Sequence, residues 1–112
     1  MEDIGKKNFN SPDETATPAE KLKVDTVTFG DKKFQRITAE PGWKWSEHVK
    51  PVAGTDSCEK HHLVYIISGT LATRMKDGKE EEFSAGEMGV IPPGHDGWTV
   101  GDDPVVWLEI TS

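Results

Sequence analysis

The sequence predicts a single all-β domain, and two patterns along the chain favour this class. Short segments of alternating or continuous apolar residues recur about every 8 to 12 residues from position 24 onward. Dipeptides that favour turns separate these segments, and no segment has the periodicity of an amphipathic helix. Many short strands joined by tight turns are typical of a sandwich or jelly roll.

The first half of the chain contains one predicted hairpin followed by a less regular region. Residues 24–29 alternate between apolar and polar, Gly30 and Asp31 form a turn, and residues 34–38 supply the partner strand. Pro41 and Gly42 then interrupt the pattern. Residues 44–62 are the least strand-like part of the predicted domain.

The second half contains most of the predicted strands. Residues 63–67 are apolar at every position, which predicts a strand that is buried on both faces. Residues 70–76 follow, and Asp77 and Gly78 form a strong two-residue hairpin turn. The remaining predicted strands are residues 81–83, 88–91, 98–100 and 105–110.

The N-terminus differs in composition from the rest of the chain. Residues 1–20 contain few bulky apolar side chains, and positions 11–18 are rich in Ser, Pro, Thr and acidic residues. Such a segment cannot offset the entropy lost on ordering. We therefore expect a flexible tail over residues 1–20 and one domain over residues 21–112. A short helix, or a strand exchanged with a partner subunit, is the alternative for the tail.

Charge and cysteine content exclude several classes of protein. The net charge is −7, from 20 acidic and 13 scattered basic residues, which argues against a nucleic-acid partner. No apolar stretch approaches the roughly 20 residues of a membrane span, and the acidic start is unlike a signal peptide. The single cysteine excludes an internal disulfide and suits a reducing compartment. We expect a soluble cytoplasmic protein.

Two segments resemble the two halves of the cupin signature. Gly86, Pro92 and Gly94 have the Gly-x5-Pro-x-Gly spacing of the second half, and Gly69 ends the apolar strand that belongs to the first. The chain is most similar to a group of small, uncharacterised cupins that share Pro-Gly-Trp, a Cys shortly before the strand, and Pro-Pro-Gly-His-Asp. The resemblance covers about residues 24–110 and implies the cupin double-stranded β-helix, a jelly-roll barrel.

In cupins, two histidines and a glutamate from the first motif and one histidine from the second bind a divalent metal ion. Here His48 fits the first histidine position, but Lys50 occupies the second, and an ammonium group cannot bind metal. His62 stands where the family has glutamate. Gly97 occupies the place of the last histidine, and His95 lies two residues earlier.

The motifs nevertheless hold four other candidate metal ligands: His48, Cys58, His62 and His95. His and Cys suit Zn, Fe, Ni or Cu better than Mg or Ca. Each residue also has a simpler interpretation: a solvated histidine at His48, a small core residue at Cys58, a core histidine at His62 and a turn residue at His95. Together within a cupin frame they predict a shared divalent transition-metal site, with catalytic residues unassigned.

Four tryptophans add a prediction about the interior. Trp43, Trp45, Trp98 and Trp107 are expected to fill the core of a small barrel. A pocket that is partly walled by indole rings would also suit a small organic ligand.

Three functions remain open from the sequence. One is a metal-dependent enzyme, an oxygenase or isomerase, in which Cys58 is a ligand or a nucleophile with His62 or His95 as its base. Another is a module that binds or senses a small molecule without turnover. The third is a structural barrel whose metal site has decayed. Cupins of this kind are often dimers, so a homodimer joined by edge strands or exchanged N-terminal segments is also expected.

Overall fold

The computed structural model describes residues 4–111 and contains β-strands with two single-turn helices. The strands are β1 (Glu14–Ala19), β2 (Leu22–Phe29), β3 (Lys32–Ala39), β4 (His62–Ser68), β5 (Thr70–Met75), β6 (Glu80–Ser84), β7 (Met88–Ile91), β8 (His95–Thr99) and β9 (Val105–Thr111). The helices are α1 (Trp45–His48) and α2 (Lys50–Ala53). The all-β prediction is confirmed.

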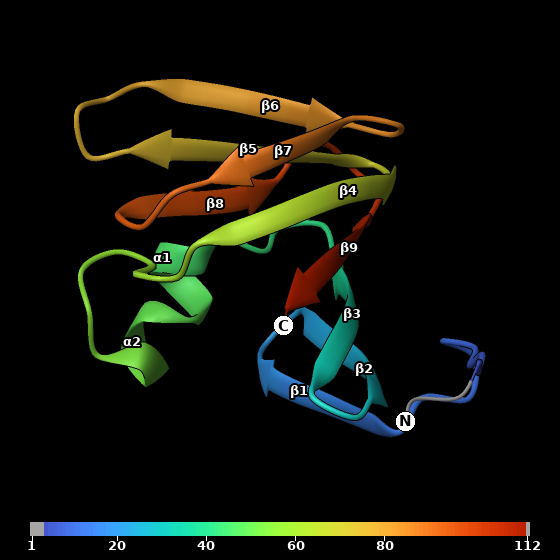
Figure 1. The fold of residues 1–112 in the computed structure, drawn as a ribbon. Coiled ribbons are helices and arrows are strands. Elements are labelled where there is room, and N and C mark those ends of the chain that lie inside the picture. Colours follow the sequence, from blue (N-terminus) through green and yellow to red (C-terminus); the bar gives the residue numbers. More distant parts are fainter. Residues whose placement is uncertain (1–3, 112) are drawn as a thin grey trace.

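The strands form two antiparallel sheets that face each other (Figure 1). The larger sheet has six strands in the order β1-β2-β3-β9-β4-β7, and the smaller has three in the order β6-β5-β8. Strand β9 pairs with both β3 and β4, so the last strand joins the N-terminal hairpin to the middle of the chain. The helices lie in the connection between β3 and β4, within the region predicted to be least strand-like. Neither helix is long and apolar enough to cross a membrane.

The core lies between the two sheets and is built from the inward positions of the alternating strands. Its buried members are Ile37, Ala39, Trp43, Trp45, Cys58, Val64, Ile66, Leu71, Ile91, Val105 and Trp107. Three of the four tryptophans therefore belong to the core, as the sequence predicts, whereas Trp98 is only partly buried.

Strand β4 differs from its prediction. Val64 and Ile66 are buried, but Leu63, Tyr65 and Ile67 on the opposite face are 49%, 41% and 47% exposed. The prediction of burial on both faces is wrong, because the smaller sheet covers only the inner face of the larger one. The apolar outward face of β4 is left without a covering layer among the described residues.

The segment predicted to be a flexible tail also differs where the structure describes it. Glu14–Ala19 form β1, an edge strand that pairs with β2, and residues 1–3 of the predicted tail lie outside the described residues. Lys7 donates to Asp13 (2.9 Å) and to the Thr28 carbonyl (2.7 Å), which ties the preceding residues to β2. Backbone pairing, these polar contacts and the stacking of Phe9 on Arg36 order the segment.

A buried ion pair fixes this N-terminal segment against the outer face of the sheet. Asp25 is only 2% exposed, and it accepts hydrogen bonds from Arg36 (2.9 Å) and Thr15 (2.9 Å). Arg36 also donates to the carbonyl of Phe9 (3.1 Å). Burial alone raises the pKa of Asp25, but the hydrogen bonds from Arg36 and Thr15 outweigh it and hold the pKa below its usual range.

The turn between β4 and β5 depends on a glycine. Gly69 has φ +77°, and a Cβ there would overlap the carbonyl oxygen of Pro104 and lie 2.8 Å from the Cα of Val105. The chain leading into β9 therefore passes directly over this turn. Gly78, in the β5–β6 hairpin, also has a positive φ (+93°) but faces open space.

Replacing these two glycines separates backbone strain from steric overlap. Gly78→Ala should lower the free energy of unfolding by about 1 kcal/mol, the cost of a left-handed conformation for a residue with a Cβ. Gly69→Ala should lower it by about 3 kcal/mol, because the overlap with Pro104 and Val105 adds to that strain. Urea denaturation measures both. Equal losses in the two variants would contradict the close approach at Gly69.

Candidate metal centre

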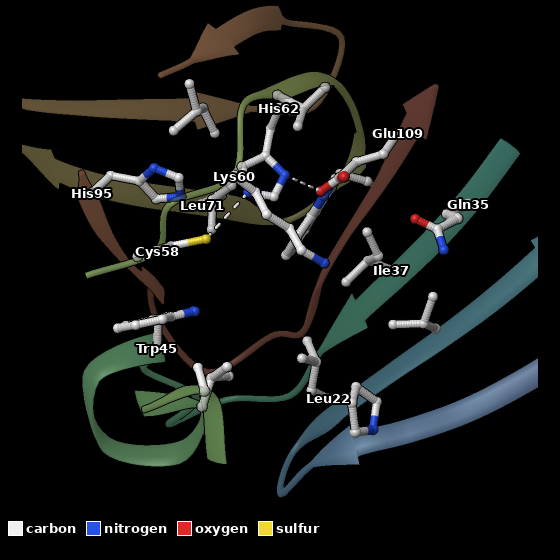
Figure 2. Close-up of a pocket in the computed structure, with 18 of the residues that line it drawn as sticks. Leu22, Gln35, Ile37, Trp45, Cys58, Lys60, His62, Leu71, His95 and Glu109 are labelled. Atoms are coloured by element: carbon white, nitrogen blue, oxygen red, sulfur yellow. Dashed lines mark hydrogen bonds and ion pairs between the residues drawn. The ribbon is translucent and has the colours of Figure 1, made fainter. Parts of the chain in front are cut away.

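Three of the four predicted ligands meet at one end of the cavity between the sheets (Figure 2). His62 begins β4, His95 begins β8, and Cys58 lies in the loop between α2 and β4. The Cys58 N–H donates to the His95 carbonyl (2.8 Å), and the Gly94 N–H donates to the Cys58 carbonyl (2.7 Å). These backbone bonds hold the loop that carries Cys58 against the start of β8.

The side-chain donor atoms of the three residues converge. The Cys58 Sγ lies 3.5 Å from His62 Nε2, and one donor atom from each of Cys58, His62 and His95 lies within 4.8 Å of the others. The two imidazole rings are edge to face, with centroids 5.1 Å apart. Cys58 and His95 are buried and His62 is half-buried, so the group is largely shielded from bulk water.

Hydrogen bonds on the far side of each ring determine which nitrogen faces the group. His95 Nδ1 lies 2.7 Å from the Pro92 carbonyl oxygen and must donate to it, which leaves Nε2 as the free ring nitrogen. His62 Nδ1 lies 2.9 Å from Glu109 Oε1. Metal-binding histidines are commonly oriented by such a bond to a carbonyl or carboxylate.

Glu109 is a member of the site that the sequence analysis missed. It lies on β9 beside β4, and it accepts hydrogen bonds from both His62 and the Trp107 indole (2.8 Å). One sequence signal pointed to it. Glu109 is two residues after Trp107 in a predicted strand, so its carboxylate had to face the same side as a core residue. The pairing of β9 with β4, which brings it to His62, is not visible in the sequence.

The pKa values of Cys58 and His62 move in opposite directions. Burial by itself raises the pKa of Cys58, but hydrogen bonds from His62 and His95 outweigh it and lower the pKa to about 6. Burial by itself lowers the pKa of His62, but its bonds with Cys58 and Glu109 outweigh it and raise the pKa to about 9. Without metal, a thiolate facing an imidazolium is therefore the favoured state near neutral pH.

His48 does not join the group. Its Nδ1 lies 3.1 Å from the Lys44 N–H, at the start of its own helix, and its side chain contributes no atom to the cluster. Lys50, at the family's second-histidine position, forms a surface ion pair with Asp56 (3.5 Å). Neither side chain is among those that line the cavity, and both residues belong to the single helical turns α1 and α2, whose conformation the motif spacing does not contain.

The cluster opens into a cavity of about 560 Å³. Trp43, Trp45 and Trp107 line it, together with aliphatic side chains such as Leu22 and Ile37. In Figure 2, Trp45 and Leu22 lie across the cavity from His62, and the Lys60 side chain extends into the same space. The pocket has the mainly apolar walls that are typical of small-molecule sites, with polar side chains among them.

Comparisons with known proteins identify the fold. No protein-family model and no curated protein matches the chain. Among solved structures, the polyketide cyclase RemF from Streptomyces resistomycificus is similar over 96% of this chain and 78% of its own, with a TM-score of 0.68 and 16% identity. A cupin-like protein from Thermotoga maritima is similar over 81% of this chain and 68% of its own, with a TM-score of 0.57 and 15% identity. The fold is that of a cupin.

Oxalate decarboxylase from Lactobacillus farciminis gives a TM-score of 0.60 at 19% identity over 87% of this chain. The chain spans only 30% of the length of that enzyme. At such identities the similarity establishes the fold alone. The predicted all-β cupin jelly roll is confirmed, whereas membership of the Pro-Pro-Gly-His-Asp group remains a prediction.

The opposed pKa values of Cys58 and His62 can be measured in metal-free protein. The ultraviolet absorbance of the thiolate should titrate with an apparent pKa of about 6, and Cys58→Ser should abolish the signal. His62→Gln removes the imidazolium, so the pKa should rise to or above the ordinary value of about 8.5. The exposed neighbour His61 provides the control, and His61→Gln should leave the titration unchanged. Identical curves for the two glutamine variants would refute the pairing.

Proposed function

We propose that this protein holds a divalent transition-metal ion between Cys58, His62 and His95 and binds or acts on a small molecule in the adjoining cavity. The observation that carries the proposal is the convergence of one sulfur and two imidazoles whose Nδ1 atoms are already engaged by Pro92 and Glu109. That arrangement leaves Nε2 of each ring directed at the thiol.

The donor set fits a transition metal in type and spacing. Zinc bonds of about 2.3 Å to sulfur and about 2.1 Å to nitrogen put the two atoms roughly 3.6 Å apart in a tetrahedral site. Cys58 Sγ and His62 Nε2 are separated by 3.5 Å. The widest separation in the group, 4.8 Å, requires a movement of about 1 Å by one side chain to complete such a site. The same donors suit Fe, Ni and Cu, so the identity of the metal remains open.

Three protein ligands leave a coordination position for water or a ligand, as in catalytic rather than structural zinc sites. A bound ion would supply Lewis acidity there. The chain's own residues orient the ligands and shape the cavity beside them. Glu109 and Pro92 orient the two rings, and Trp43, Trp45 and Trp107 supply apolar walls to the adjoining cavity. An apolar ligand body would pack on Trp45 and Ile37 with its polar group toward the cluster.

A second candidate function follows from the same geometry. Cys58, His62 and Glu109 form a continuous chain of contacts, from Sγ to Nε2 (3.5 Å) and from Nδ1 to the carboxylate (2.9 Å). This is the arrangement of a nucleophile, a base and an orienting acid. His62 would hold the thiol proton, and the thiolate would add to a carbonyl carbon of the ligand as the C=O π bond breaks and its electron pair moves to the oxygen. The imidazolium would then give its proton to that oxygen, and Glu109 would stabilise the imidazolium until it does. In this account no metal is needed.

Metal binding tests the first proposal directly. Cys58→Ser, His62→Ala and His95→Ala should each weaken the affinity for Zn²⁺ or Co²⁺ by at least about 10-fold, because each removes one of three ligands. Glu109→Gln should weaken it by about 10- to 100-fold through the orientation of His62. Calorimetric titration of the metal-free protein measures these affinities.

His48→Ala is the matched control for this series, since it removes a histidine that lies outside the cluster. It should bind metal as the parent protein does. A parent protein that binds neither ion, or an equal affinity in all variants, would leave the structural-barrel alternative in place.

Alkylation of Cys58 distinguishes the two candidate functions. The metal-free protein should react with iodoacetamide faster than an ordinary buried thiol, because the thiolate is already formed near neutral pH. Under the metal proposal, stoichiometric Zn²⁺ should slow this reaction at least about 10-fold by occupying the sulfur. Rapid alkylation that added metal leaves unchanged would instead favour the thiol nucleophile. Mass spectrometry of the labelled peptide gives the rate.

A further inference from the structure

The larger sheet has a broad apolar surface on the side that faces away from the cavity. Leu63, Tyr65 and Ile67 of β4, Met88 and Val90 of β7, and Leu108 and Ile110 of β9 make up this surface, hereafter the outer apolar face. Met88 is 74% exposed, Val90 58% and Ile110 53%. Large, strongly exposed apolar side chains gathered in one place call for an explanation that scattered ones do not.

The strand register shows that these side chains are contiguous. Leu63 pairs directly with Val90, and Tyr65 pairs with Met88 on one side and Leu108 on the other. Residues that are directly opposite in an antiparallel pair present their side chains on the same face, close enough to touch. The outer apolar face therefore runs without a break across β7, β4 and β9.

No charge interrupts this face along the three strands. β4 and β7 contain no Asp, Glu, Lys or Arg, and the only such residue of β9 is Glu109. Glu109 points inward, to His62. A chain with 33 charged residues, 20 acidic and 13 basic, thus keeps one sheet surface free of them. Surfaces that are meant to face water rarely have this composition.

The size of the face suits a protein interface. Its six strongly exposed side chains present on the order of 600 Å² of apolar surface, at the upper end of the roughly 300–600 Å² seen for the largest patch on a monomer. A standard interface takes about 800 Å² from each partner, including a polar rim. The face can therefore supply the apolar centre of such an interface.

The chain covers the neighbouring part of the same sheet surface with its own residues. The Phe9 ring stacks on Arg36 at 5.4 Å, and Gly5 lies against Phe29, so the segment before β1 lies over β2 and β3. Within residues 4–111, that cover stops short of β9, β4 and β7, where the six side chains remain exposed. The outer apolar face is therefore the part of this sheet surface that the described N-terminal segment leaves exposed.

Charge decides between the candidate occupants. A net charge of −7 repels anionic lipid surfaces and nucleic acid. It also makes two copies of the chain repel each other, but salt screens this repulsion beyond about 10 Å, and a contact surface without charges adds no like-charge pairs to it. A two-fold axis brings the same patch of both subunits together, and an uncharged apolar sheet face is complementary to itself.

We propose that the outer apolar face is a homodimer interface, in which the β7-β4-β9 surface of one copy packs face to face on the same surface of a second copy. This arrangement differs from the edge-strand pairing and segment exchange expected from the sequence. It also reaches the candidate metal centre. β4 carries His62 on its inner face and Leu63 on its outer face, and β9 carries Glu109 and Leu108 in the same way. Dimerisation would hold together the two strands that orient His62.

Light scattering coupled to size-exclusion chromatography tests the proposal on the full-length, metal-free protein. The parent chain of 12.4 kDa should elute with twice that mass. Met88→Lys and Tyr65→Lys each bring a charge into the interface and should yield the monomer, with an apparent dissociation constant at least about 100-fold weaker. Both positions are already exposed in the subunit, so each variant should keep its fold.

Val52→Lys is the matched control. Val52 lies on α2 and is 72% exposed, close to the 74% of Met88, but it is outside the outer apolar face. This variant should remain a dimer. Circular dichroism identifies any variant that fails to fold, and the Met88 and Tyr65 variants give independent readings.

Three results would overturn the proposal. One is a parent protein that is monomeric throughout the micromolar range. Another is a dimer that survives in folded Met88→Lys and Tyr65→Lys variants, which would place the contact elsewhere. The third is a monomeric parent that binds neutral phosphatidylcholine vesicles through Met88, which would assign the face to lipid.

Discussion

Strand β9 lies between β3 and β4, and its two antiparallel ladders hold the larger sheet together. Through β9, the hairpin of β2 and β3 joins the same sheet as β4 and β7. The same pairing sets the register that puts Glu109 beside His62 and lets the Trp107 indole donate to the same carboxylate. One set of long-range backbone bonds therefore determines the architecture and the orientation of a site residue together. The close passage of the chain over Gly69 as it enters β9 belongs to the same constraint.

The site itself shows how burial and hydrogen bonding compete. Burial opposes the charged forms of both Cys58 and His62, yet the contacts between them, and with Glu109 and His95, reverse the direction of each pKa shift. Asp25 on the outer surface of the sheet follows the same rule through Arg36 and Thr15. Among the described residues, Asp25, Cys58 and His62 are each shielded from water beside specific partners that offset the cost of desolvation. The two groups differ in their surroundings. The Cys58 group lines the cavity, whereas Asp25 does not.

Much of the fold was predictable because its signals are local. The Asp77-Gly78 turn, the alternating segments and the glycine-proline spacing around Pro92 act through short-range backbone geometry. The differences between expectation and structure have another cause. Glu14–Ala19 are ordered by pairing with β2, the outward face of β4 lacks a covering layer, and His48 is turned away by a helical turn. The first two depend on which strands and layers become neighbours, although these are distant in sequence. The position of His48 depends on a helical turn that the spacing of a motif does not reveal.

By itself, the sequence determined the class of the fold, and it predicted three candidate ligands that the structure brings together. The cupin-like spacing and the residue types of Cys58, His62 and His95 were enough, because strand periodicity and donor chemistry are properties of single residues and short segments. Only the tertiary structure decided that Glu109 completes the group, that His48 lies outside it, and that an uncharged face remains uncovered. Those facts rest on which strands become neighbours. Strand pairing is a long-range choice, fixed by burial and backbone hydrogen bonding over the whole chain.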